Sequence, residues 1–317
     1  MHTVKKVLLA SPRGFCAGVA RAVKAVEDTL DLFDSPVYVK HEIVHNKHVV
    51  SRIEAKGAVT VENLVDIPDE SVVVFSAHGS TPKEFREAKA RGMTLIDATC
   101  PLVTKVHLEV IRFLKEGYSI VYIGHKGHPE GIGVMAEAQG KTIPIVENLQ
   151  DVAALQIDNP EKLVYLTQTT LSLDDTRKII EALQKKYPQI IAPPLEDICY
   201  ATTNRQTAVT ELARVVEVVL VIGSVNSSNS RRLMETAKRE GAEAYLLDDV
   251  RDLDPKWLEG KETVGITAGA SAPEDRVQEL VEFFRRDGAM IESYVAKSEN
   301  MQFAEPVELM KLKRERS

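Results

Sequence analysis

The sequence predicts an α/β protein built from three similar domains with mainly parallel sheets, and two observations lead to this prediction. Short apolar segments rich in β-branched residues alternate along the chain with segments whose apolar residues recur every three or four positions. That alternation is typical of strand–helix–strand units. In addition, three cysteines stand 84 and 99 positions apart, and each follows an apolar run and precedes a helical pattern. This recurrence indicates an internal repeat of whole domains, because solenoid repeats are shorter.

Seven segments are predicted to be strands because they are short, rich in β-branched residues and bounded by turn-forming residues. They are residues 7–10, 37–39, 72–75, 119–123, 163–166, 218–222 and 263–266. Helical periodicity occupies the intervals, and one example is the run that contains Ile179, Ile180 and Leu183. Parallel sheets of this kind bind ligands at the carboxyl ends of their strands, so we expect the functional residues there.

Residues at matching distances from the cysteines support the repeat. Gly124 stands 24 positions after Cys100, and Gly223 stands 24 positions after Cys199. Hydroxyl-rich segments follow the same two cysteines after 67 and 68 positions, whereas the chain after Cys16 matches more loosely. Together with a proline pair at positions 193 and 194, this spacing predicts three domains and a C-terminal segment that packs back or frays. The predicted ranges are 1–94, 95–194, 195–290 and 291–317.

The composition is that of an ordinary α/β protein and argues against two kinds of partner. Of the 317 residues, 44% are hydrophobic and 5% are aromatic. A net charge of −7 disfavours nucleic acid binding, which needs a concentrated basic surface. No apolar stretch approaches the roughly 20 residues of a membrane span, and no signal-peptide pattern precedes the first predicted strand. With three cysteines and no close pair, we expect a cytoplasmic protein without structural disulfides and without a nucleic acid or membrane partner.

Cys16, Cys100 and Cys199 are the candidate metal ligands. A cysteine at the start of a helix faces unpaired backbone N–H groups and the positive end of the helix dipole, which favours the thiolate. Any one of the three, taken alone, is equally well explained as a buried core residue. Three at equivalent positions favour a shared soft-metal site, and the lack of a C-x₂-C pair favours an iron–sulfur cluster over zinc. Three ligands leave one iron of a four-iron cluster open, as a Lewis-acid catalyst requires.

A second group of polar residues lies at or just after predicted strand ends and near predicted helix starts. Neutral donors at helix N-termini bind phosphate groups without a basic patch, so these residues predict a diphosphate site. Helix capping alone explains Ser228 and Ser271 equally well. The sequence contains neither the phosphate loop of nucleoside triphosphatases nor the glycine-rich turn of dinucleotide-binding folds. The group comprises His41, His45, His78, His125, His128, Thr169, Thr170, Ser227, Ser228, Asn229 and Ser271.

Glu130 is the one carboxylate inside a loop that contains histidine and glycine, and it stands two positions after His128. Its place predicts a proton donor. An acidic residue in the first turn of a helix is also favoured by the helix dipole alone, and this alternative stays open. Two of the histidines, His41 and His125, receive no role from the sequence.

These motifs together resemble the family of 4-hydroxy-3-methylbut-2-enyl diphosphate reductases, also called the LytB family, which act last in the non-mevalonate isoprenoid pathway. The resemblance extends over nearly the whole chain, and the combination of motifs is highly specific. The matching segments are residues 12–18, 41–46, 76–79, 97–103, 127–130, 167–172, 197–206, 227–230 and 267–273.

The resemblance implies a pseudo-threefold trefoil of α/β domains around one central [4Fe–4S] cluster, held by Cys16, Cys100 and Cys199 with one iron open. It implies that two electrons and two protons remove the allylic hydroxyl of (E)-4-hydroxy-3-methylbut-2-enyl diphosphate as water, which yields isopentenyl diphosphate and dimethylallyl diphosphate. Glu130 and Thr169 are the implied proton path, and ferredoxin or flavodoxin is the implied kind of electron donor. The residues implied for substrate binding are His45, His78, His128, Thr169, Thr170, Ser227, Ser228, Asn229 and Ser271.

Two alternatives from other classes stay open at this stage. One is a cysteine-dependent transferase or hydrolase in which a single thiolate acts with a histidine. The other is a non-enzymatic iron–sulfur sensor. A brown colour of the anaerobically purified protein separates the first alternative from the iron–sulfur interpretations. Turnover of the allylic diphosphate with a chemical reductant separates the enzyme from the sensor.

Overall fold

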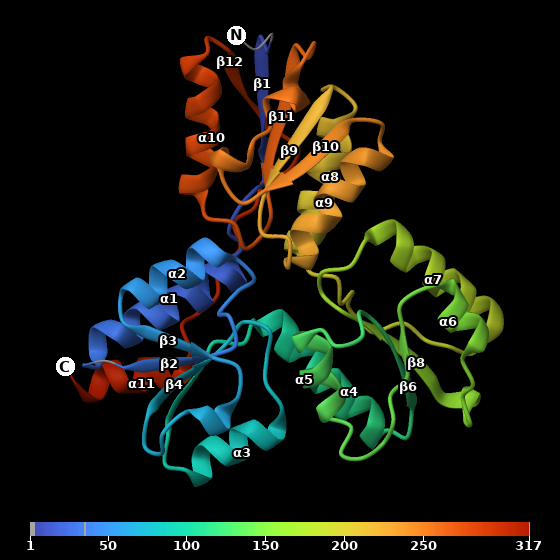
Figure 1. The fold of residues 1–317 in the computed structure, drawn as a ribbon. Helices are drawn as coiled ribbons and strands as arrows, with labels where there is room; N and C mark the ends of the chain where they lie inside the picture. Colours follow the sequence, from blue (N-terminus) through green and yellow to red (C-terminus); the bar gives the residue numbers. More distant parts are fainter. Residues whose placement is uncertain (1–3, 35, 317) are drawn as a thin grey trace. The chain divides into compact units, whose positions relative to one another are not determined.

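Three separate sheets, each with all of its paired strands parallel, form the framework of the computed structural model, which describes residues 4–34 and 36–316 (Figure 1). This arrangement confirms the predicted α/β class. The chain divides into two compact units, and each is described by itself below. Within the described ranges, no helix has both the length and the apolar composition needed to cross a membrane.

The first unit contains residues 4–20, 44–52 and 200–302, and it holds a five-stranded sheet in the order β10–β9–β11–β1–β12. Helices cover both faces of this sheet. Leu220 and Ile222 of β9 pack in one apolar cluster, which includes residues of α10. Val219 and Val221 pack in a second cluster, with residues of α8 and α9. The element bounds are β1 Lys6–Ser11, α8 Tyr200–Ala213, β9 Val218–Ile222, α9 Ser228–Arg239, β10 Glu243–Leu247, β11 Thr263–Ala268, α10 Glu274–Arg286 and β12 Met290–Val295.

The second unit contains residues 21–34, 36–43, 53–199 and 303–316 and holds two sheets, in the orders β3–β2–β4–β5 and β7–β6–β8. Two helices, α1 Ala17–Leu32 and α2 Lys47–Ala55, begin in the first unit and end in this one. The strands are β2 Val37–Lys40, β3 Ala58–Val61, β4 Val72–Phe75, β5 Thr94–Asp97, β6 Ser119–Ile123, β7 Ile145–Val146 and β8 Leu163–Thr167. The helices are α3 Pro82–Ala90, α4 Pro101–Lys115, α5 Pro129–Ala136, α6 Leu149–Ala154, α7 Leu173–Lys186 and α11 Val307–Glu315.

The strand nearest the N-terminus belongs to the same sheet as strands far along the chain. β1 lies between β11 and β12, with Val7 in register with Val264 on one side and Ile291 on the other. Its four inner residues are buried, so an internal position in the sheet suits its apolar sequence. The sheets therefore do not follow the four predicted ranges one by one, and those ranges stay a prediction about domains.

The C-terminal helix α11 packs against β5 within the second unit. Leu309 on this helix is fully buried, and Lys313 Nζ donates to Asp28 Oδ2 and Glu305 Oε2, both at 2.8 Å. The end of the chain is therefore attached to the second unit by an apolar contact and by ion pairs.

The seven predicted strands are confirmed as β1, β2, β4, β6, β8, β9 and β11. Among the described residues, five further strands were not expected, and every one of them lies at the edge of its sheet. They are β3, β5, β7, β10 and β12.

Candidate functional site

Each of the three cysteines stands directly before a helix, Cys16 before α1, Cys100 before α4 and Cys199 before α8. All three side chains are half-buried. Cys100 is the N-cap of α4, and Pro101 follows at the first helical position, where no N–H partner is needed. The backbone N–H of Val19 donates to Cys16 Sγ at 3.5 Å, which stabilises negative charge on this sulfur.

One backbone hydrogen bond recurs at all three cysteines. In each case the cysteine N–H donates to the carbonyl of the residue two positions beyond the end of a strand, which is β11, β4 or β8. This shared geometry supports the internal repeat that the cysteine spacing predicts. The bonds join Cys16 to Ala270 (3.2 Å), Cys100 to Ala77 (3.0 Å) and Cys199 to Thr169 (3.1 Å).

The chemistry of these three positions fits an iron–sulfur cluster. Thiolate sulfur is the ligand that such clusters take, and each of the three cysteines stands directly before the start of a helix. Within residues 4–34 and 36–316, no three His, Cys, Asp or Glu side chains are gathered as a site for a single metal ion. The argument for an iron–sulfur cluster at these cysteines therefore depends on their sulfur donors and on their equivalent positions in the three loops.

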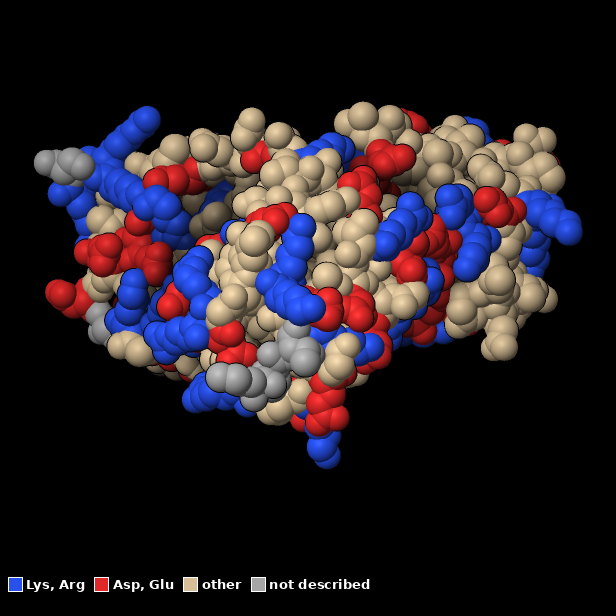
Figure 2. All heavy atoms as spheres, turned by 90° about the horizontal axis from the view of Figure 1, so that it is seen from above, with Lys and Arg blue, Asp and Glu red and all other residues tan. Residues whose placement is uncertain are grey.

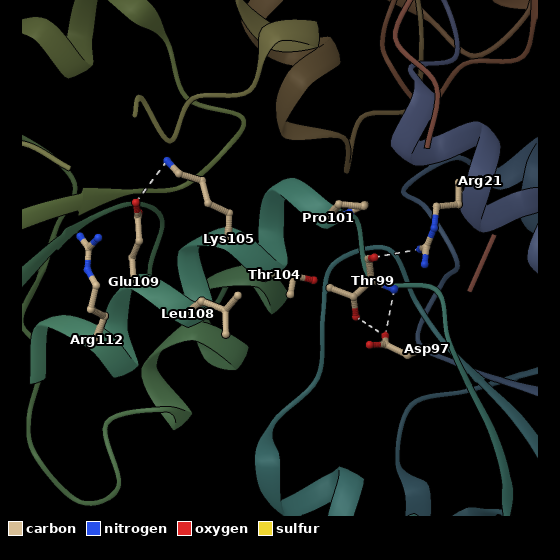
Figure 3. A pocket seen from close by; sticks show the side chains of 9 residues that line it. All are labelled: Arg21, Asp97, Thr99, Pro101, Thr104, Lys105, Leu108, Glu109 and Arg112. Atoms are coloured by element: carbon tan, nitrogen blue, oxygen red, sulfur yellow. Dashed lines mark hydrogen bonds and ion pairs between the residues drawn. The ribbon is translucent and has the colours of Figure 1, made fainter. Parts of the chain in front are cut away.

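The loop before Cys100 is held by side chains that also line a cavity of about 470 Å³ (Figure 3). Asp97 Oδ1 accepts hydrogen bonds from the N–H and the hydroxyl of Thr99, and Arg21 Nη1 donates to the Thr99 carbonyl at 2.9 Å. These bonds fix the turn that delivers Cys100 to the start of α4. The lining residues are Arg21, Asp97, Thr99, Pro101, Thr104, Lys105, Leu108, Glu109 and Arg112.

The loop before Cys16 is held by a buried arginine that the sequence analysis did not identify. Arg205 is fully buried and donates to the carbonyl of Gly14 from Nε at 3.1 Å and from Nη2 at 2.8 Å. Glu299 accepts from Nη1 and Nη2, so the charge of Arg205 is paired. The sequence contained one indication of this role, because polar residues lie on nearly all sides of α8. Buried polar residues in a helix need specific hydrogen-bond partners.

Glu130 and Thr169 form a buried pair in the second unit. Glu130 Oε1 accepts from the Thr169 N–H at 2.7 Å, and Oε2 accepts from the Thr169 hydroxyl at 2.9 Å. Burial raises the pKa of Glu130 to about 7; the bonds from Thr169 oppose the shift, and the charge of Asp197 adds to it. A carboxyl group with this pKa exchanges a proton near neutral pH, as a general acid must.

His78 and His128 lie close together in the same unit, with ring centroids 6.2 Å apart and ring planes at 84°. His128 is the N-cap of α5, and its Nδ1 accepts from the Glu130 N–H at 3.2 Å. In the neutral ring, Nε2 then carries the hydrogen and acts as a donor. The structure thus brings together His78, His128, Glu130 and Thr169, four of the predicted site residues.

Five other predicted residues lie in the first unit, namely His45, Ser227, Ser228, Asn229 and Ser271, whereas Thr170 and His125 belong to the second unit. Ser227 is the N-cap of α9, and Ser228 and Asn229 occupy its first turn. The Ser271 hydroxyl donates to the His45 carbonyl at 3.0 Å and lies 3.4 Å from Ser227 Oγ, so these segments are in contact.

The Asn229 side chain shows that this group is suited to a polar ligand. The residue is 4% exposed, and neither Oδ1 nor Nδ2 has a hydrogen-bond partner among the described residues. A buried amide without partners is costly unless a ligand supplies them.

His41 stands at the position of the repeat that Gly124 and Gly223 occupy elsewhere. The N–H of each of these three residues donates to the last carbonyl of the neighbouring strand, β3, β7 or β10. His41 Nδ1 lies 2.6 Å from Glu62 Oε2, so the ring is bound to a surface carboxylate.

Charged side chains are interspersed on the face shown in Figure 2, where lysines and arginines alternate with aspartates and glutamates. The candidate binding residues themselves are uncharged donors except for the histidines. Anion binding by this group therefore depends on hydrogen bonds and helix starts.

The chain is similar over most of its length to proteins of one family. The family model described as LytB protein matches residues 7–285. A reductase of Actinobacillus pleuropneumoniae serotype 7, named 4-hydroxy-3-methylbut-2-enyl diphosphate reductase, is 53% identical over 306 residues, which is 96% of this chain and 98% of the relative. The protein of the same name from Pseudomonas aeruginosa is 51% identical over 308 residues, with 96% and 98% covered.

Two solved structures are similar as well. The E-1-hydroxy-2-methyl-but-2-enyl-4-diphosphate reductase of Plasmodium falciparum superposes with a TM-score of 0.96 at 40% identity and covers 99% of both chains. A structure described as (E)-4-hydroxy-3-methyl-but-2-enyl diphosphate reductase, the terminal enzyme of the non-mevalonate pathway, gives a TM-score of 0.65 at 32% identity, with 89% of this chain and 100% of that chain covered. The chain therefore belongs to the LytB family of 4-hydroxy-3-methylbut-2-enyl diphosphate reductases, a family of iron–sulfur enzymes, as its motifs predict.

Proposed function

We propose that the chain reduces (E)-4-hydroxy-3-methylbut-2-enyl diphosphate to isopentenyl diphosphate and dimethylallyl diphosphate, the last step of the non-mevalonate pathway. The observation that carries this proposal is the Glu130–Thr169 pair. The Glu130 carboxyl group, whose pKa is about 7, accepts a hydrogen bond from the Thr169 hydroxyl. The carbonyl of Thr169 in turn accepts from the Cys199 N–H. A proton donor thus stands beside a candidate cluster ligand, as reductive removal of a hydroxyl requires.

Cys16, Cys100 and Cys199 are proposed to hold one [4Fe–4S] cluster with one iron open. When bound, the cluster supplies electrons and a Lewis-acid iron. The chain's own part is to present three thiolates from helix starts, on loops held by Arg21 and Arg205.

The diphosphate is proposed to be held by neutral donors. The Nε2–H of His128 and the unpartnered Asn229 amide are examples of groups oriented to donate to an anion. The starts of α5 and α9 add backbone N–H groups and the positive ends of their dipoles. The proposed diphosphate-binding residues are His45, His78, His128, Ser227, Ser228, Asn229 and Ser271. Thr169 and Thr170 are proposed as further substrate-binding residues.

Proton delivery is proposed to run from Glu130 through Thr169. When Glu130 is protonated, its O–H can donate to Thr169 Oγ1, and the threonine hydrogen then points toward the leaving hydroxyl. Because hydroxide is a poor leaving group, this proton lets the oxygen depart as water. Two protons and two electrons are consumed, and a ferredoxin or a flavodoxin is the proposed electron source, in the cytoplasm.

The test is anaerobic purification followed by analysis of iron, sulfide and turnover with a chemical reductant. The proposal expects about four irons and four sulfides per chain, from the cluster type it names, and conversion of the allylic diphosphate to both products. Colourless, iron-free protein with a transferase or hydrolase activity would support a cysteine-dependent enzyme instead. Iron–sulfur content without turnover would support a sensor.

We expect air to inactivate the protein, because a cluster in which one iron lacks a protein ligand is more accessible to oxidants than a cluster held by four protein thiolates. Timed exposure should reduce turnover together with iron content, and electron paramagnetic resonance should detect a three-iron form first. Full activity after prolonged aerobic handling would contradict the three-cysteine site.

We expect diphosphate binding to need no divalent metal, because uncharged donors and helix starts supply the contacts. Asn229→Ala should weaken the affinity for inorganic pyrophosphate about tenfold, as expected for losing a hydrogen bond to a charged group. The exposed Asn300→Ala in the same unit is the control. A strict magnesium requirement, or equal affinity of the two variants, would rule out this pocket.

A further inference from the structure

Gln168 is a fully buried polar residue that directly follows the last residue of β8, the strand that pairs with β6 (Figure 1). Its backbone N–H donates to the Ile123 carbonyl at 2.8 Å, which joins the ends of the two strands. A buried side-chain amide is stable only when its donors and acceptor have partners. The partners of Gln168 are His125, which has no role in the proposed function, and Thr170.

The orientation of the Gln168 amide follows from its contacts with His125. The Gln168 Oε1 atom lies 3.0 Å from the His125 backbone nitrogen and 3.1 Å from His125 Nδ1. A backbone N–H can only donate, so the atom facing it must be the carbonyl oxygen. Since that oxygen only accepts, Nδ1 of His125 carries a hydrogen as well. The backbone N–H of His125 therefore excludes the flipped amide.

The fixed amide determines which way the Thr170 hydroxyl points. Gln168 Nε2 lies 3.1 Å from Thr170 Oγ1, and Nε2 is a donor in the only orientation that His125 permits. Thr170 Oγ1 therefore accepts this bond, and its own hydrogen is directed away from Gln168. A hydroxyl held in this way is oriented to donate to an anion.

Gly124 allows His125 to come this close. A Cβ atom on Gly124 would lie 3.3 Å from Gln168 Cβ and 2.4 Å from Tyr122 Cε1. The side chain of any other residue would force the segments apart, so the glycine is needed for the contact between the His125 N–H and Gln168.

In the first unit, a different buried residue donates to a candidate phosphate-binding hydroxyl. At the position equivalent to Gln168 stands Gly269, whose N–H donates to the Ile222 carbonyl at 2.9 Å. The space for a side chain there is occupied by Ser230, whose Oγ would lie 2.0 Å from a Cβ on Gly269. Ser230 is fully buried, and its N–H and hydroxyl both donate to Ser227 Oγ. Here too, a buried residue donates to the oxygen of a candidate phosphate-binding hydroxyl.

We propose that His125 and Gln168 are positioning residues that fix the Thr170 hydroxyl as a hydrogen-bond donor to the diphosphate of the substrate. This inference rests on the proposed function. It assigns a role to His125 and explains why a buried glutamine separates Thr167 from Thr169.

The test is Gln168→Glu, which keeps the size of the side chain but can only accept hydrogen bonds when ionised. The carboxylate would turn the Thr170 hydrogen inward and remove it from the ligand. Isothermal titration of the anaerobic holoprotein with inorganic pyrophosphate should give an affinity lower by about tenfold to a hundredfold, the range for a hydrogen bond to a charged group. Steady-state kinetics should show a higher KM with kcat changed much less, and iron content should equal that of the wild type.

A double-mutant cycle separates this role from simple charge repulsion. If Gln168 acts through Thr170, Gln168→Glu should add little in a Thr170→Val background. Repulsion by the new charge would instead persist in that background, and this outcome would overturn the proposal. Gln150→Glu adds the same charge at an exposed position of the same unit and should bind as the wild type does.

Gln168→Met keeps the test decisive if the glutamate variant does not fold. It removes the donor without adding a charge, so pyrophosphate affinity should fall a few-fold, by about the value of one neutral hydrogen bond. Wild-type affinity in this variant would show that Gln168 has no positioning role, while turnover by the wild type would leave the proposed function intact. A wild-type protein that neither binds pyrophosphate nor reduces the substrate would overturn both.

Discussion

Replacing any one of Cys16, Cys100 and Cys199 with serine is expected to remove the cluster and abolish turnover. The three residues occupy the same backbone position, each with its N–H bonded two residues beyond a strand end, so no one of them should be dispensable. Serine is nearly the same size and can make the same backbone bond. Its oxygen is a hard ligand of high pKa, however, and iron–sulfur clusters require soft thiolates.

Iron and sulfide analysis of anaerobically purified variants measures this effect directly. Far-UV circular dichroism is the control for folding, because the backbone bonds at these positions do not depend on the sulfur. We expect each variant to keep its secondary structure and to lose most of its iron and sulfide. A variant that retained the wild-type iron and sulfide would mark its cysteine as a core residue and not a ligand.

Glu130→Gln is expected to lower turnover by about a hundredfold or more, the usual contribution of a general acid. Glutamine fills the same buried space and can still accept from Thr169, so the fold, the cluster and substrate affinity should stay near normal. It cannot supply the proton that the leaving oxygen needs. The loss should therefore appear in kcat, with KM little changed.

The pH dependence of turnover gives an independent readout of the same residue. The pKa of Glu130 is raised to about 7 by burial, so the protonated acid is abundant below pH 7 and is depleted as the pH rises through that value. Wild-type kcat should fall on the alkaline side of about pH 7, and the glutamine variant should lack this decline. The stability of the fold should also decrease as the pH rises, because burial favours the neutral form of the Glu130 carboxyl group. The contribution of Glu130 to stability should be fully present below its ordinary pKa of 4.5, decrease as the pH rises from there through about 7, and level off above that value.

A matched control for this prediction is Glu161→Gln, the same change at an exposed position of the same unit. It should leave kcat and its pH profile unchanged. Wild-type turnover in Glu130→Gln would mean that Glu130 only begins the helix α5 and that the proton comes from elsewhere.

The central strands and the cysteine loops could be predicted from the sequence because their signals are local. β9 and β4 lie inside their sheets and are continuous apolar runs, since both of their faces are covered. The five edge strands that were not predicted gave no such signal, whereas β8 is an edge strand with a fully buried apolar sequence and was predicted. β12 is exposed or half-exposed at every position and β7 has only two residues, so neither forms an apolar run. Edge strands are defined by their neighbour in space, which a local pattern does not contain.

The candidate residues at strand ends were also predictable, because parallel sheets place their binding loops at that edge and the motifs lie there. The resemblance to a known family then assigned roles to them. What these residues do with one another was not predictable. The pKa of Glu130 depends on its burial and on Thr169, 39 positions away, and the bond between these two exists only in the folded chain.

The supporting residues were decided by the tertiary structure alone. Arg205 reaches the Gly14 carbonyl across 191 positions, and the Gln168 amide is oriented by His125, 43 positions away. A buried arginine and a buried glutamine carry no distinctive local pattern, because their chemistry is set by whichever donors and acceptors the fold brings within about 3 Å. The sequence by itself determined the α/β class, the thiol ligands and the polar residues at the strand ends. Only the fold decided which of these groups holds a proton, which is held in place, and by what partner.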